Sequence, residues 1–191
     1  EASDPARTIT GAKQMDWLLT GLDRSTARWN VIANQVMMAE QRTSLADPPP
    51  VNMDAWDGYP ADRQKLFDGV LEQRVDGLVV ITGDTHTNYA SDLKQNFDDM
   101  NSPTVGVEFV GTSISSGRDG SDSTPGLELA LEANPHIKFD NFQRGYVACE
   151  IDRDTARADY RIVPYVTERG APISTRASFV SERLNPGLEA V

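Results

Sequence analysis

Cysteine is nearly absent from this sequence of 191 residues. Cys149 is the only one, so no disulfide can form within the chain. Cysteine usage therefore does not decide the compartment, because cytoplasmic proteins and many exported bacterial proteins both lack disulfides. Cys149 ends the apolar-rich run Gly145-Tyr146-Val147-Ala148-Cys149, and we expect a small buried hydrophobic side chain rather than a ligand or a nucleophile.

Positive charge is also scarce. The sequence has 18 Lys and Arg against 29 Asp and Glu, for a net charge of −11. Nucleic acid is excluded as a partner, because its phosphates need a basic footprint, and electrostatic docking to anionic membranes is disfavoured. No apolar run has the length of a membrane helix, so we expect neither a transmembrane segment nor a signal peptide at Glu1. An anionic substrate would need local attraction, which metal ions supply.

The remaining composition is that of a globular protein, with 39% hydrophobic and 25% charged residues. The length fits one large domain or a compact portion of a larger one. The patterns predict a mixed α/β fold. The expected helices cover 11–22, 61–73 and 127–131, the first capped by Thr10, and the expected strands cover 29–36, 78–82, 105–110, 145–151 and 157–163. On the first helix, the apolar face comprises Met15, Leu18, Leu19 and Leu22, and Trp17 could extend it.

The motif with the clearest chemistry is Gly83-Asp84-Thr85-His86, which follows the apolar run Leu78-Val79-Val80-Ile81. In extended backbone, a carboxylate and an imidazole at i and i+2 point to the same side. They could then reach one point beyond the edge of the sheet and bind a metal, since carboxylates suit hard cations and imidazoles suit transition metals. A hydrogen-bonded pair without a metal is the structural alternative.

Three further segments could contribute to a site. Met53–Pro60 carries Trp56 and Tyr59 and is either an ordered functional loop or a packed corner. Met37 and Met38 are either core residues or a wall of a substrate cleft. The loop 111–117 has small hydroxyl residues between glycines and could line a pocket, but no P-loop lysine follows it.

The sequence cannot be that of a complete calcineurin-like metallophosphoesterase. Its site begins with Asp-x-His but needs a later Gly-Asn-His and more histidines, whereas this sequence has only His86 and His136. Several blocks instead resemble, in order, the PhoD-type alkaline phosphatases and phosphodiesterases, which include phospholipase D-like members. These blocks are 29–37, 54–60, 82–90, 107–117, 134–139 and 144–146, and they span most of residues 10–163.

The resemblance implies a four-layer αββα sandwich, of which residues 1–191 are the C-terminal portion of a single catalytic domain. It implies a centre of Fe³⁺ and Ca²⁺, with other divalent metals as alternatives, in a protein secreted by bacteria. Asp84 would bind calcium, and His86 would bind the metal cluster or the phosphate. The family's other ligands precede this portion, and Cys149 does not stand at the position of the family's metal-binding cysteine.

Two ligands cannot hold a cation that takes six or more oxygens, so we expect the N-terminal piece of the same enzyme to be a partner. Together they would hydrolyse a phosphate ester or phospholipid, with His86 or His136 as the proton donor. For His136 a structural hydrogen-bonding role is an equal alternative. Trp56 and Tyr59, with Met37 and Met38, would contact the alcohol portion of the substrate.

Two other classes of function stay open. One is a binding or interaction module that keeps the fold without the full site, which the missing ligands favour and the presence of Asp84 and His86 disfavours. The other is an unrelated α/β enzyme that uses these two residues as an acid–base pair. No nucleophile stands at a recognisable spacing from them, so this reading is the weaker one.

Overall fold

A computed structural model describes residues 2, 4–46, 49–123 and 131–191, and it shows helices stacked on two sheets. The helices are α1 (Ala12–Asp23) and α2 (Pro60–Glu72), with the short 3-10 helix η1 (Trp56–Gly58) between them in sequence. The strands are β1 (Asn30–Ala33), β2 (Leu78–Thr82), β3 (Asn88–Lys94), β4 (Thr104–Val110), β5 (Ile137–Asn141), β6 (Arg144–Ile151), β7 (Thr155–Val163), β8 (Ser174–Glu182) and β9 (Asn185–Ala190).

The strands form two separate sheets. Sheet A has the order β1-β2-β4-β3-β5, in which β1, β2 and β4 are parallel and β3 is antiparallel to both of its neighbours. Sheet B is the antiparallel series β6-β7-β8-β9. The central parallel strands β2 and β4 are mostly apolar because all but one residue of each strand is buried, on both faces of the sheet.

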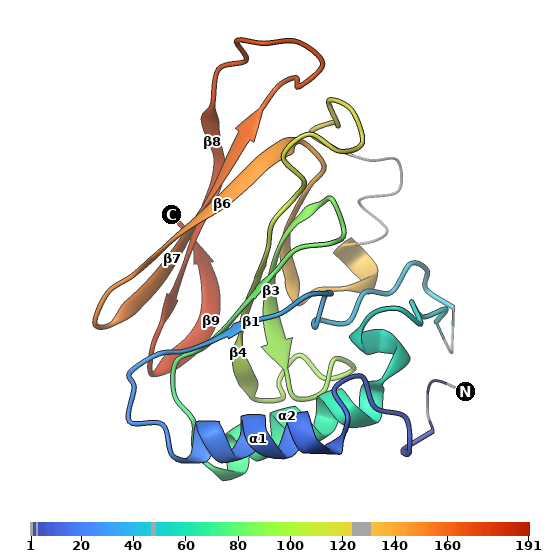
Figure 1. Ribbon diagram of the computed structural model, residues 1–191, viewed down its shortest axis with the longest axis vertical. Coiled ribbons are helices and arrows are strands. Elements are labelled where there is room, and N and C mark those ends of the chain that lie inside the picture. The colour runs from blue at the N-terminus through green and yellow to red at the C-terminus, as the bar shows by residue number, and fades with distance from the viewer. Residues whose placement is uncertain (1, 3, 47–48, 124–130) are drawn as a thin grey trace.

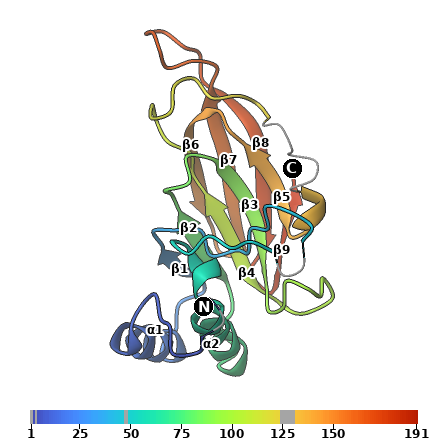
Figure 2. The same ribbon diagram turned by 90° about the vertical axis from the view of Figure 1, so that its right-hand side faces the viewer.

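Two hydrophobic clusters join the layers. One lies between the helices and sheet A and includes Met15, Leu66 and Val80. The other lies between sheet A and sheet B and includes Val79 and Tyr160. Helices, sheet A and sheet B thus follow one another, with α1 and α2 side by side (Figures 1 and 2). The expected α/β class is confirmed, and these are three layers of the expected αββα sandwich.

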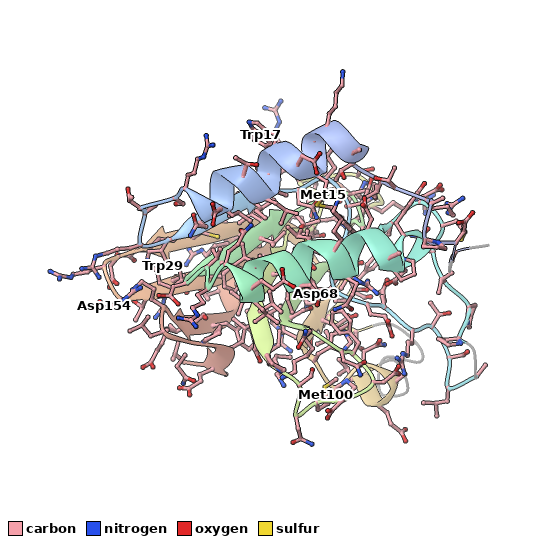
Figure 3. The ribbon with its side chains drawn as sticks, turned by 90° about the horizontal axis from the view of Figure 1, so that it is seen from below. Met15, Trp17, Trp29, Asp68, Met100 and Asp154 are labelled. Carbon is pink, nitrogen blue, oxygen red and sulfur yellow. The ribbon has the colours of Figure 1, made fainter. Side chains whose placement is uncertain are left out.

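The first helix differs from expectation at its start and on one face. It begins at Ala12 after Gly11, whose φ of 75° is left-handed, and Thr10 is not the cap because its hydroxyl binds the Asp62 carboxylate. Met15 and Leu22 are buried as expected. Trp17 is 72% exposed and lies on the outer side of α1 (Figure 3), so it does not extend the apolar face.

Three other expectations are corrected or fall outside the described range. β1 ends at Ala33 because the Asn34 side chain donates to the Val36 carbonyl and turns the chain there. Cys149 is exposed rather than buried, because it lies on the edge strand β6 where sheet A does not cover it. The helix expected over 127–131 falls almost entirely on residues outside the description. The hairpin of β6 and β7 is confirmed.

None of the helices in the described part of the chain is both long and apolar enough to cross a membrane.

Candidate metal centre

The candidate centre lies at the carboxyl end of sheet A. β1, β2 and β4 are parallel, so their carboxyl ends meet at one edge, where ligand sites of open α/β sheets usually form. Asp84 and His86 follow β2 directly, in the turn that leads back into β3. The topology therefore brings the predicted metal ligands to the edge at which the sequence placed them.

The backbone of this turn is not extended, which corrects the expected geometry. Asp84 has φ of 70° and His86 has φ of 57°, both in the left-handed region that costs non-glycine residues about 1–3 kcal/mol each. Both side chains are exposed, and in the described structure neither one hydrogen bonds to another group. The structure does not form the hydrogen-bonded pair that was the structural alternative.

The turn is held by its backbone. The His86 carbonyl accepts hydrogen bonds from the Arg144 Nη1 group at 2.7 Å and from the Thr112 hydroxyl at 2.9 Å. The buried Asn88 side chain accepts the Thr112 amide at 3.1 Å, which ties the start of β3 to the end of β4. Sequence reasoning missed these three residues as site residues. They do lie within the blocks that carry the family resemblance, but a sequence block does not show which residues contact one another.

A buried carboxylate lies beneath the same edge. Glu108 on β4 is fully buried, and burial raises the pKa of its carboxyl group. It accepts the Thr82 hydroxyl at 2.6 Å and the backbone amides of Met38 and Ala39 at 2.9 and 2.7 Å. Glu108 thus joins the end of β2 to the segment after β1, and it is satisfied by these donors rather than free for a metal.

The two aromatic candidates for substrate contact have different surroundings. Trp56 is 4% exposed in the helix-side cluster, and its indole donates to the Asn34 side chain at 3.2 Å. Tyr59 is half-buried, with the Arg7 guanidinium 4.6 Å from its ring centre. Met53–Pro60 is a packed corner, and Met37 and Met38 are core residues. Contact of these side chains with a substrate stays a prediction.

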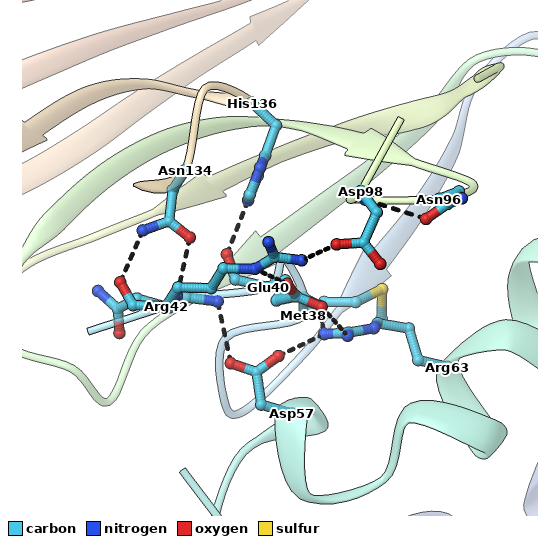
Figure 4. A network of polar contacts seen from close by, with 10 residues as sticks. Met38, Glu40, Arg42, Asp57, Arg63, Asn96, Asp98, Asn134 and His136 are labelled. Atoms are coloured by element: carbon cyan, nitrogen blue, oxygen red, sulfur yellow. Dashed lines mark hydrogen bonds and ion pairs between the residues drawn. The ribbon is translucent and has the colours of Figure 1, made fainter. Parts of the chain in front are cut away.

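His136 belongs to a different polar cluster (Figure 4). It is 1% exposed, and its Nε2 contacts the Glu40 carbonyl at 2.7 Å, so Nε2 carries the proton. Burial lowers the pKa of His136 to about 4. The Glu40 carboxylate pairs with Arg42 and Arg63, and Asn134 exchanges two hydrogen bonds with the Arg42 backbone. This geometry favours the structural role of His136, and its catalytic role stays a prediction.

Asp84 and His86 fit a metal, but only as part of its ligand set. Their donors are a carboxylate and an imidazole, exposed and without a partner in the described chain. Among the described residues, no group of three or more His, Cys, Asp or Glu side chains is arranged to hold a metal ion. Because calcium takes six to eight oxygens, the two residues could contribute to a shared centre and could not form one alone.

Comparison with known proteins gives one consistent result. The family model described as PhoD-like phosphatase matches residues 1–160. Alkaline phosphatase D of Bacillus subtilis (strain 168) is 44% identical over all 191 residues, although the chain spans only 33% of that protein. The solved structure described as "Structure of PhoD" matches the whole chain with a TM-score of 0.96 at 44% identity, and 37% of that structure is covered. The chain belongs to the PhoD-like phosphatase family.

Proposed function

We propose that this chain is the C-terminal portion of a catalytic domain that hydrolyses phosphoric esters with bound metals, and that it contributes Asp84 and His86 to their centre. The observation that carries the proposal is the turn after β2. It exposes a carboxylate and an imidazole without internal partners, on backbone held in a costly conformation. The likeness to alkaline phosphatase D supports the reaction class.

Asp84 supplies the oxygen donor that Ca²⁺ prefers, and His86 supplies an imidazole that suits iron or donates to a phosphoryl oxygen. When bound, Fe³⁺ and Ca²⁺ would polarise the phosphoryl group and lower the pKa of a bound water. His86 is also the better proton donor to a leaving group. It is exposed, whereas the only N–H group of neutral His136 is bound to the Glu40 carbonyl.

The remaining ligands would come from the N-terminal piece of the same enzyme, which we propose as the partner of this chain. The two sheets are open on one side. Val31 on β1 and Ile81 on β2 share a face with Val79, which packs against sheet B, yet they are 47% and 37% exposed. Ile151 at the end of β6 is exposed too.

These exposed residues lie on faces that point into the sandwich. The Trp29 indole, just before β1, donates to the Asp152 carbonyl just after β6, which places the two sheet edges on the same side. Two-thirds of the length of alkaline phosphatase D lies outside the matched region, which is enough chain to cover the opening. Unpaired edges and exposed inner faces are liabilities that such a neighbour would remove.

The competing proposal is a binding or interaction module that keeps the fold and has no activity. The lack of a third ligand among the described residues favours it, and the exposed, unpartnered state of Asp84 and His86 opposes it. The substrate could be a phosphomonoester, a phosphodiester or a phospholipid. Export from a bacterial cell stays a prediction.

The test uses the complete gene product, with all sequence that its gene encodes on either side of this chain. Asp84→Asn and His86→Gln are compared with Asp23→Asn, which alters an exposed carboxylate at the end of α1. We expect iron and calcium in the purified protein by elemental analysis, and hydrolysis of p-nitrophenyl phosphate or its diester. Each site variant should lose metal and about 100-fold in kcat/KM, whereas the control should keep both.

Wild-type activity and metal content retained by both site variants would disprove the assignment of Asp84 and His86. A metal-free and inactive complete protein would support the binding module instead.

A further inference from the structure

Within the described part of the chain, Arg144 is a buried cation without an anionic partner. It is fully buried at the start of β6, and among the described residues it forms no ion pair. Nη1 donates to the His86 carbonyl at 2.7 Å, to the Ser113 hydroxyl at 2.9 Å and to the Thr112 hydroxyl at 3.3 Å, while Nε donates to the Arg118 carbonyl at 3.1 Å. All of these acceptors are neutral. Burial of an unpaired charge costs several kcal/mol, so its retention needs a reason.

The surrounding chain is shaped to hold this guanidinium. Its carbon lies 4.3 Å from the Phe142 ring centre, in a stacked cation–π contact. Gly120 has φ of 74°, and a Cβ there would lie 2.1 Å from the Phe142 carbonyl oxygen and 3.1 Å from the Arg144 Nε. At Gly117, a Cβ would come within 3.5 Å of Nη2. The loop after β4 can close over Arg144 because these positions lack side chains.

The hydrogen bond to the His86 carbonyl indicates a structural role for the buried Arg144 guanidinium. This carbonyl belongs to the turn in which both Asp84 and His86 have left-handed backbone. Such a conformation persists only where its surroundings fix it. Arg144 and Thr112 both donate to this carbonyl, and the orientation of the peptide group between His86 and Thr87 bears directly on the direction of the His86 side chain. Asp84 lies two residues earlier in the same turn.

We propose that Arg144 is a positioning residue that fixes the turn between β2 and β3, and thereby aims Asp84 and His86 at the metal centre. The orientation of Asp84 and His86 toward a metal rests on the proposed function, whereas the stabilisation of the turn by Arg144 does not. A lysine at this position would keep the charge but lack the planar fork that reaches the His86 carbonyl, the Arg118 carbonyl and the hydroxyl groups together. The fork, more than the charge, is what the turn needs.

The experiment compares Arg144→Lys and Thr112→Val in the complete gene product. Arg153→Lys, in the exposed turn between β6 and β7, is the control. Amide hydrogen exchange of residues 83–88 is the main measurement, and exchange of β7 reports the rest of the fold. Binding of Ca²⁺ alone is measured by calorimetry on metal-stripped protein.

We expect exchange of residues 83–88 to accelerate about tenfold in both variants, with β7 unchanged. The apparent Ca²⁺ dissociation constant should rise about 10- to 100-fold. If Arg144→Lys fails to fold, Thr112→Val still tests the second bond to the same carbonyl. Normal protection of the turn in Arg144→Lys, or equal acceleration in β7, would overturn the proposal. Faster exchange in the turn with unchanged Ca²⁺ affinity would overturn the aiming of ligands.

The two proposals can fail separately. Metal and activity that survive Asp84→Asn and His86→Gln remove the proposed function, yet the exchange result for Arg144 still stands or falls by itself.

Discussion

Protonation of His136 is the clearest pH-dependent event at the scale of single residues. Burial lowers the pKa of this imidazole from 6.5 to about 4, so the unfolded chain takes up a proton at this position first as the pH falls. The neutral ring therefore contributes stability that is fully present above pH 6.5 and is lost as the pH falls to about 4. A shift of this size corresponds to about 3 kcal/mol at most.

We expect the unfolding free energy of the complete gene product to decline more steeply between pH 6.5 and pH 4 in the wild type than in His136→Gln. Glutamine can still donate to the Glu40 carbonyl and does not titrate. The measurement is denaturant unfolding across this range, with NMR titration of the ring as the direct check. A ring that titrates near its ordinary value would contradict the prediction.

At the scale of elements, the parallel pair β2 and β4 carries the candidate centre, and one glycine sets how closely the strands approach. A Cβ added to Gly106 on β4 would lie 2.6 Å from the Leu78 carbonyl oxygen and 2.9 Å from the Leu78 Cβ. Both neighbours belong to the adjacent buried strand and cannot swing away. Gly106 is therefore required by close packing, although its own backbone is not left-handed.

Gly106→Ala should lower the unfolding free energy by about 2 kcal/mol or more, because the strands must separate or shift register. Gly21→Ala is the matched control in α1, where an added Cβ meets nothing within 4 Å. That change should raise stability by about 0.5–1 kcal/mol, as alanine favours a helix. Thermal unfolding of both variants shows whether Gly106→Ala lowers stability while Gly21→Ala raises it. Equal changes in stability would contradict this account of β4.

At the scale of the whole molecule, the open side of the sandwich makes a prediction about the proposed partner. Val31 and Ile173 are almost equally exposed here, at 47% and 45%. Val31 lies on the inner face of sheet A, where the N-terminal piece should cover it. Ile173 lies in the loop between β7 and β8, which Figure 1 shows at the end of the molecule away from α1 and α2.

Val31→Glu should destabilise the complete gene product by about 3 kcal/mol or more, because a carboxylate would be buried without a partner. Ile173→Glu should change stability by no more than about 0.5 kcal/mol, as surface substitutions do. Melting temperatures of the two variants give the answer. Similar small shifts would show that Val31 stays exposed and that no neighbour covers this face.

Much of the architecture could be predicted because it depends on local pattern. The run Leu78-Val79-Val80-Ile81 has no polar interruption, so it predicts a buried strand, and Gly83 predicts the end of that strand. Errors arose where the pattern does not say which neighbour is present. Trp17 and Cys149 are apolar residues in well-placed elements, but one faces away from the core and the other lies on an edge. Exposure of such residues depends on packing between elements.

The sequence by itself determined the α/β class, the placement of Asp84 and His86 after β2, and the family, because these depend on periodicity and on short motifs in a fixed order. Only the tertiary structure decided that the turn has left-handed rather than extended backbone, that the buried Glu108 carboxylate accepts hydrogen bonds, and that Arg144 donates to the His86 carbonyl. These contacts join residues 26 to 70 positions apart. No local pattern encodes them, because loop closure and sheet packing bring such residues together only in the folded chain.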